Sequence, residues 1–321
     1  MPPASTVRFA FAALPVRGCL AAQTEPQRMI EAGHWKRARA IVEARFPHAP
    51  AGPLANFPLS QVRNAFGGRD SPLPLAEKAV ALDGRTARHR RQVAECLGAM
   101  AQHSNTIRQP LLARRLRSEI DRALALDPRD PQARRDLMEF YLLAPGIVGG
   151  DPRRAAETAA GIPAQARLAD YRKRTADAEA CLRRAAGVQP PSYRALVALA
   201  GFYAATVPPR FDDARKSAAE ARALDPGRVD AYAILADIHA ARAMWDELDA
   251  VLAASARAVP DDLKPFYRAA LRLLASGSDL ARAEGCLRIY LAEPPEGNAP
   301  SAAEARAQLV LVLDRQRRAA A

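Results

Sequence analysis

Apolar residues in the C-terminal half of the chain recur with the period of a helix and are interrupted at regular intervals. Three prolines, Pro226, Pro260 and Pro294, close successive blocks, with 34 residues from each to the next. Within a block, apolar residues fall at i, i+3, i+4 and i+7 in two runs separated by a short break. The break and the closing proline each end a helix. The pattern therefore predicts two short amphipathic helices in every block.

The blocks also place similar residues at similar positions. In the first block, Leu196, Leu199 and Tyr203 share one helical face, and Phe211 and Ala214 open the second helix, which closes with a Leu-Asp-Pro sequence. This 34-residue helix–turn–helix resembles the tetratricopeptide repeat (TPR). The resemblance is strong over residues 193–294 and looser over 27–192. It implies an all-α fold, an α-solenoid forming a right-handed superhelix with a C-terminal capping helix.

Irregular spacing divides the chain into segments. We expect irregular TPR-like repeats over residues 26–190, regular repeats over 191–296, and a capping helix and tail over 297–321. The unit between Pro163 and Pro190 is short and should disturb the regular twist of the array. Ser301 and Glu304 form a capping box that predicts the start of the last helix.

Residues 1–25 differ from the rest of the chain. Arg8 precedes a short apolar run, and Ala21 and Ala22 follow it, which is the layout of a secretory signal. Arg17 interrupts the run, so an N-terminal tail without fixed structure is the alternative. If residues 1–22 are a signal, the protein is periplasmic or secreted, and otherwise it is cytoplasmic. No apolar run reaches the ~18 residues of a transmembrane helix, so we expect no transmembrane segment.

A glycine-rich loop, Ala144-Pro-Gly-Ile-Val-Gly-Gly-Asp151, stands out between two predicted helices. It resembles a loop found in a bacterial subgroup of TPR proteins, mostly predicted to be exported. Such a loop before a helix can bind phosphate, but Asp151 is placed as an N-cap and Pro152 as the first helical residue. The carboxylate would then occupy the free amides. We interpret the loop as an enlarged turn, with a partner contact or an anion site as alternatives.

The chain is strongly basic, with a net charge of +12 and a pI of about 10.1. Five of its 47 basic residues are Lys and the other 42 are Arg, a residue suited to phosphates and carboxylates. RNA or polyanion binding is therefore one alternative, although aromatic residues for base stacking make up only 6% of the chain. The other interpretation is that Arg lies on solvated helix faces.

Residues with catalytic or metal-binding spacing are not evident. The sequence has no CxxC pair, no phosphate-binding or nucleophile motif, and no two histidines at helical spacing. His239 stands where the repeat pattern places an aromatic residue. We therefore expect its ring to be packed and to make a hydrogen bond. Two acidic pairs lie at turns before predicted helices, and we expect them to be N-caps: Asp212-Asp213 and Asp261-Asp262. We expect no catalytic residue, no cofactor and no metal.

The resemblance implies a non-enzymatic scaffold that holds a protein or peptide in the concave groove of the array. A periplasmic solute-uptake accessory subunit is a further alternative. The first helix of each repeat presents its second, fifth, ninth and twelfth residues to this groove. The basic members should bind carboxylates, unless these side chains are solvated or paired with one another. The candidate groove residues are Arg91, Arg135, Glu139, Arg194, Asp230, Asp237, Lys264 and Tyr267.

Overall fold

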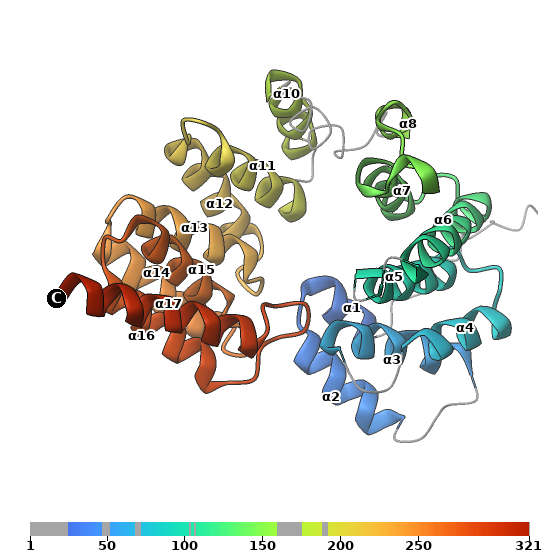
Figure 1. The fold of residues 1–321 in the computed structure, drawn as a ribbon, viewed down its shortest axis with the longest axis horizontal. Coiled ribbons are helices and arrows are strands. Elements are labelled where there is room, and N and C mark those ends of the chain that lie inside the picture. The colour runs from blue at the N-terminus through green and yellow to red at the C-terminus, as the bar shows by residue number, and fades with distance from the viewer. Residues whose placement is uncertain are drawn as a thin grey trace, which may run out of the picture.

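The structure, a computed structural model, describes residues 25–46, 52–67, 72–102, 104–105, 107–158, 175–187 and 192–320. Within these ranges the regular elements are all helical, and helices that follow one another in the chain pack together in pairs (Figure 1). The fold is an α-solenoid of helix–turn–helix repeats, which confirms the predicted class. The predicted signal or tail lies outside the described residues, except for Glu25.

The N-terminal half runs from blue to green in Figure 1. Its elements are α1 (Glu25–Ala32), α2 (Trp35–Arg45), α3 (Pro53–Phe66), α4 (Leu73–Leu82), α5 (Ala87–Gln102), α6 (Arg108–Leu126), α7 (Pro131–Leu143), the 3-10 turn η1 (Gly146–Val148) and α8 (Pro152–Thr158).

The C-terminal half runs from yellow-green to red. Its elements are α10 (Thr175–Ala186), α11 (Tyr193–Ala205), α12 (Phe211–Leu224), α13 (Asp230–Ala241), α14 (Trp245–Ala258), α15 (Lys264–Ser276), α16 (Leu280–Ala292) and α17 (Ala302–Ala320).

The core of the C-terminal half follows the helical periodicity of the sequence. Leu235 of α13, Leu248 of α14, Leu273 of α15 and Leu287 of α16 are buried in one continuous cluster. Between them lie small residues, mostly Ala, which let the helices approach closely. Burying a Leu side chain contributes about 1.5–3 kcal/mol, so these stripes hold each helix pair against the next.

The last helix, α17, packs on α16. Its N-terminus is capped as the sequence predicts, because Ser301 Oγ accepts from Glu304 N at 3.2 Å and the Glu304 carboxylate accepts from Ser301 N at 2.6 Å. The fully buried Tyr290 of α16 donates its hydroxyl to Pro300 O at 2.6 Å. These bonds fix the turn that leads from α16 into α17.

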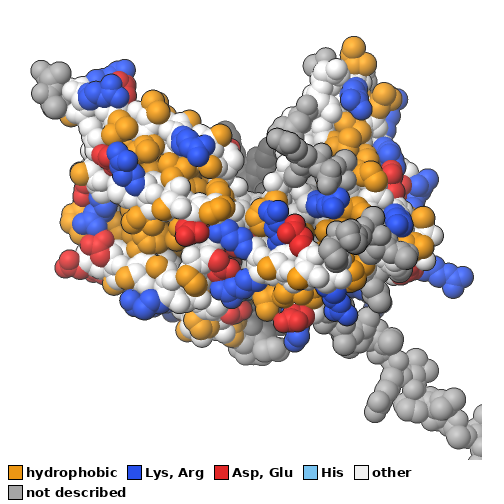
Figure 2. All heavy atoms as spheres, turned by 90° about the horizontal axis from the view of Figure 1, so that it is seen from below, with side chains coloured by type: hydrophobic (Ala, Val, Ile, Leu, Met, Phe, Trp, Pro, Cys, Tyr) orange, Lys and Arg blue, Asp and Glu red, His pale blue; other side chains and the backbone are white. Residues whose placement is uncertain are grey.

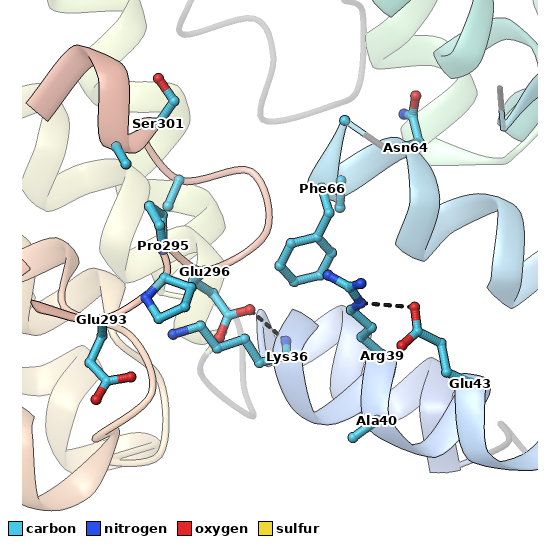
Figure 3. A pocket seen from close by; sticks show the side chains of 15 residues that line it. Lys36, Arg39, Ala40, Glu43, Asn64, Phe66, Glu293, Pro295, Glu296 and Ser301 are labelled. Carbon is cyan, nitrogen blue, oxygen red and sulfur yellow. Dashed lines mark hydrogen bonds and ion pairs between the residues drawn. The ribbon is translucent and has the colours of Figure 1, made fainter. Parts of the chain in front are cut away.

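The two halves meet where that turn reaches the N-terminal helices. Glu296 is 5% exposed, and its Oε1 accepts from the backbone N–H of Lys36 in α2 at 2.6 Å (Figure 3). Arg37 binds both carboxylate oxygens of Asp261 at 2.7 and 2.9 Å, and Asn298 N donates to Ala65 O at 3.0 Å. We call this contact the closure, because it joins the array's first units to its last repeat.

Gly297 is required at the closure by close packing. A Cβ atom at this position would lie 2.7 Å from Trp35 Cβ and 3.2 Å from Ala65 Cβ. Both neighbouring atoms are Cβ atoms fixed to helical backbone, so a side chain at 297 has to push α2 or α3 away. The absence of a side chain is what lets the turn approach the N-terminal helices.

We therefore expect Gly297→Ala to loosen the closure and to destabilise the protein by about 1–3 kcal/mol, as overpacking does. Chemical denaturation measures the loss, and small-angle X-ray scattering should show a larger radius of gyration. Gly285→Ala in α16 is the matched control, because a Cβ there meets nothing within 4 Å. The control should be neutral or slightly stabilising. Equal stability and size of the Gly297 variant and the wild type would contradict the packing argument.

The closure should also depend on pH through Glu296. Burial raises the pKa of this carboxyl to about 7, and the bonds from Gly297 N and Lys36 N offset only part of that effect. A raised carboxyl pKa means that its contribution to stability is full below the unfolded pKa and is lost as pH rises towards 7 and beyond.

Glu296→Gln keeps an oxygen acceptor for Lys36 N and Gly297 N and carries no charge. Between pH 5.5 and 8, the wild type should lose about 2 kcal/mol of unfolding free energy relative to this variant. Urea denaturation of both proteins at the two pH values measures it, and the subtraction cancels other titrating groups. Parallel pH profiles of the two proteins would show that Glu296 does not titrate in this range.

Candidate functional site

A hollow of about 850 Å³ lies beside the closure, which contributes Trp35 and Asn298 to its lining. Its walls come from α1, α2, α3, α5, α7 and α11, together with the turn before α13 and the turn before α17. Four arginines are its dominant charged groups, and we call it the arginine basin. They are Arg28, Arg91, Arg194 and Arg228.

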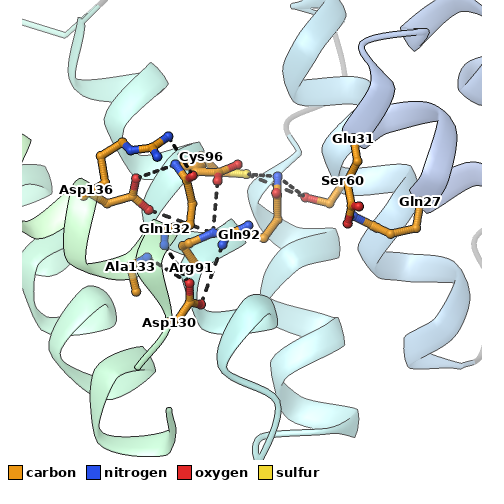
Figure 4. Close-up of polar contacts among 12 residues, drawn as sticks. Gln27, Glu31, Ser60, Arg91, Gln92, Cys96, Asp130, Gln132, Ala133 and Asp136 are labelled. Atoms are coloured by element: carbon orange, nitrogen blue, oxygen red, sulfur yellow. Dashed lines mark hydrogen bonds and ion pairs between the residues drawn. The ribbon is translucent and has the colours of Figure 1, made fainter. Parts of the chain in front are cut away.

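Arg91 of α5 lies among three carboxylates (Figure 4). Its Nε is 3.4 Å from Glu95 Oε1 and 3.9 Å from Asp136 Oδ2, and its Nη1 is 3.7 Å from Asp130 Oδ2. These are ion-pair distances that exceed those of good hydrogen bonds. Within the described part of the chain, Arg91 Nε is buried and has no hydrogen-bond partner. The guanidinium therefore retains an unused donor.

Arg194 has two other arginines near it. Burial and the nearby Arg228 and Arg135 all lower the pKa of Arg194, and this outweighs Glu31 and Asp230, which raise it. Its Nη2 donates to the backbone oxygen of Glu31 at 3.3 Å. Three guanidinium groups so close together repel one another, and an anion bound between them would relieve that repulsion.

Arg228 and Gln61 add unused hydrogen-bonding capacity to the basin. The guanidinium of Arg228 stacks on the ring of Tyr193 at 4.2 Å from its centroid. Its Nε is buried, and no described residue accepts a hydrogen bond from it. Gln61 of α3 is 7% exposed, and its Oε1 likewise has no donor among the described residues. Buried polar atoms without partners are unfavourable, and hydrogen bonds to a polar ligand would remove that cost.

The structure brings only part of the predicted groove together. Arg91 and Arg194 line the basin, and Arg135 lies close enough to Arg194 to lower its pKa. Arg135 itself donates to Gln132 Oε1 at 3.2 Å. Glu139 lines a neighbouring recess and not the basin.

The other predicted residues pair with side chains of the array or lie in its core. Asp230 binds Lys264 at 2.9 Å, and buried Asp237 binds Arg272 at 2.7 Å, so both pairs link α13 to α15. Tyr267 is 7% exposed and packs on Tyr290 with ring centroids 5.0 Å apart, which makes it a core residue instead of a groove residue.

Three expectations about single residues need correction. Asp212 and Asp213 lie inside the first turn of α12 and do not cap it. Asp261 binds Arg37 across the closure and does not cap, whereas Asp262 Oδ1 accepts from Lys264 N at 3.0 Å at the start of α15. His239 is packed as predicted, but its Nδ1 has no hydrogen-bond partner among the described residues. Desolvation by burial is the main cause of its lowered pKa.

The glycine-rich loop has the predicted cap. Asp151 Oδ1 accepts from Arg153 N at 2.8 Å at the start of α8. The carboxylate thus occupies the first free amide of the helix, which leaves an anion no vacant donor there. The loop is a turn between α7 and α8 that contains η1.

Several basin residues were not predicted from the sequence. Gln132 is the second residue of α7, so the positional rule that selected Arg194 would have found it. Arg228 and Asn298 lie on turns outside the helical pattern. Arg28 and Gln27 belong to α1, which reaches the basin only because the array closes. No local signal marks those four.

The described residues offer neither a metal cluster nor a membrane-spanning helix. They contain no group of three or more His, Cys, Asp or Glu side chains placed to hold a metal ion. They also contain no helix that is both long and apolar enough to span a bilayer.

Comparison with known proteins identifies the architecture. No protein-family model and no curated protein matches the sequence. Yeast Tom70 superposes with a TM-score of 0.53 at 15% identity, over 92% of this chain and 66% of the Tom70 chain. A TPR protein from Parabacteroides merdae gives 0.47 at 12% identity, covering 90% and 96% of the two chains. A TPR protein from Thermus thermophilus gives 0.40 at 18%, covering 64% and 91%. At 15% identity the likeness to Tom70 concerns the fold alone, and the described residues form an α-solenoid of helical repeats.

Proposed function

We propose that this protein is a non-enzymatic scaffold that binds a protein or peptide segment through carboxylate groups placed in the arginine basin. The observation that carries the proposal is that Arg91, Arg194 and Arg228 line one hollow, and that the buried Nε atoms of Arg91 and Arg228 have no hydrogen-bond acceptor among the described residues. A scaffold of this kind needs a charged hollow, and the basin supplies one.

The chemistry of the basin suits a peptide carboxylate. A guanidinium presents parallel N–H groups that match the two oxygens of a carboxylate, and such charge-assisted bonds are the strong ones. The unused oxygen of Gln61 is placed to accept a backbone N–H of the same segment. A hollow of about 850 Å³ is within the range of about 300–1,000 Å³ typical of ligand sites.

The distribution of charge favours a peptide over a long polyanion. On the face shown in Figure 2, basic side chains alternate with acidic and hydrophobic ones and do not form a continuous stripe. Many arginines are also paired, as Arg117 is with Asp121 at 2.9 Å and Arg242 with Asp212 at 2.6 Å. A nucleic-acid backbone needs a basic track along its length, whereas one carboxylate needs only a local cluster.

The first test is selection from a phage-displayed library of random dodecapeptides, followed by fluorescence polarisation with one selected peptide. We expect the selected sequences to be enriched in Asp and Glu. Arg194→Gln and Arg228→Gln should each weaken binding about tenfold or more, because each removes a charge-assisted hydrogen bond. Replacing the acidic residues of the peptide by their amides should have a similar effect.

Arg288→Gln is the matched control, since Arg288 is exposed and paired with Glu284 on α16, away from the basin. It should leave the affinity unchanged. The proposal fails if selection yields no acidic preference, or if both basin variants bind as the wild type does. A labelled uridine 20-mer that binds at low salt, without any selected peptide, would favour the polyanion alternative.

A further inference from the structure

A second recess of about 680 Å³ lies beside the arginine basin. Its walls are α5, α6, α7 and the glycine-rich loop, with Asn64 of α3 at its edge. Most of its lining is small and apolar, and includes Gly98, Ala113, Pro145 and Val148. We call it the acidic recess, because its charged groups are of one sign.

Three carboxylates line the acidic recess: Glu95 from α5, and Asp136 and Glu139 from α7. No Lys, Arg or His is among the described residues that line it. This is unexpected in a chain whose net charge is +12. Beside the recess, Arg91 is shared between Glu95, Asp130 and Asp136 at 3.4 to 3.9 Å. One guanidinium is therefore shared by three carboxylates, two of which line the recess.

The glycine-rich loop forms one wall of the recess and is held in one shape. Gly149 has φ of +103°, and a Cβ on Gly150 would lie 1.8 Å from Ala144 O, so both positions require glycine. Gly150 N donates to Pro145 O at 3.2 Å, and Asp151 N donates to Tyr141 O at 2.9 Å. These bonds place Pro145 and Val148 against the recess. The loop thus supplies an apolar surface opposite the carboxylates.

We propose that the acidic recess binds a basic side chain of a peptide, with the aliphatic part and an adjacent apolar residue lying against the loop and α6. The argument is charge complementarity: the floor is negative, the walls are apolar, and an Arg or Lys side chain has an apolar stem and a cationic end. Its volume accommodates such a side chain and its neighbour. This site is separate from the arginine basin and does not rest on the function proposed for that basin.

Asp136 gives the site a pH dependence. Burial, then the nearby Glu95, raises the pKa of Asp136 to about 7, with Glu139 adding to the rise and Arg91 and Gln132 opposing it. Burial also raises the pKa of Glu95, against the effect of Arg91. A bound cation favours the ionised carboxylate and competes with its proton. Affinity should therefore increase as pH rises, by about tenfold between pH 6 and 8 for a ligand that needs Asp136 ionised.

The test uses the acetylated and amidated pentapeptide Ala-Leu-Arg-Leu-Ala, which has no carboxylate, and its citrulline analogue, which has the same shape without the charge. Isothermal titration calorimetry with the full chain should show the arginine peptide binding about tenfold or more tightly than the citrulline peptide. Asp136→Asn and Glu139→Gln should each remove about tenfold of the arginine peptide's affinity. Asp136→Asn should also flatten its pH dependence.

Two controls separate this site from the basin and from misfolding. Asp314→Asn, at an exposed carboxylate of α17 paired with Arg318, should bind as the wild type does. Arg194→Gln should leave the affinity for the arginine peptide unchanged. Circular dichroism melting identifies any variant that has lost its fold, and the comparison of the two peptides on the wild type needs no variant. Equal affinity of the two peptides, or no binding of either, overturns the proposal.

Discussion

The contact between the Glu296 carboxylate and the Lys36 amide is the constraint on which the inner surface of this protein depends. Helix pairs alone build an arc, and an arc has an open inner face. Here the turn after α16 reaches α2 and α3, and a glycine without a side chain makes that approach sterically possible. Because the first and last units meet, side chains from α1, α5, α7 and α11 line one hollow. The closure, and not any single repeat, creates the site.

Helix α5 forms the boundary between two hollows of opposite character. Glu95 lines both, and Arg91 beside it lines the arginine basin while neutralising part of the charge of the acidic recess. An inner surface with separate positive and negative hollows is more selective than one with a uniform charge, because each repels a ligand group that the other attracts.

The helix pairs were predictable because they follow from the periodicity of the sequence. The contacts between residues far apart in the chain were not predicted. The helix pairs of residues 193–294 repeat a pattern of Leu and Ala, so their fold was predictable. Arg91 and Arg194 were selected for their positions on their helices, and both line the arginine basin, but their role in binding stays a prediction. Asp261 was misassigned as a cap, since nothing nearby in the chain reveals that Arg37 lies beside it. Tyr267 was placed in the groove by the same positional rule, but its packing on Tyr290 places it in the core.

Joining the first units of the array to its last repeat changes how the molecule comes apart. In a linear array each repeat is stabilised only by its nearest neighbours, so the terminal repeats fray first and the middle unfolds later. Once α2 and α3 pack on the turn after α16, those end units gain contacts from a partner hundreds of residues away. Unfolding of any one repeat then also disturbs the closure. A closed array should behave as a single cooperative unit, in which fraying and global unfolding become the same event.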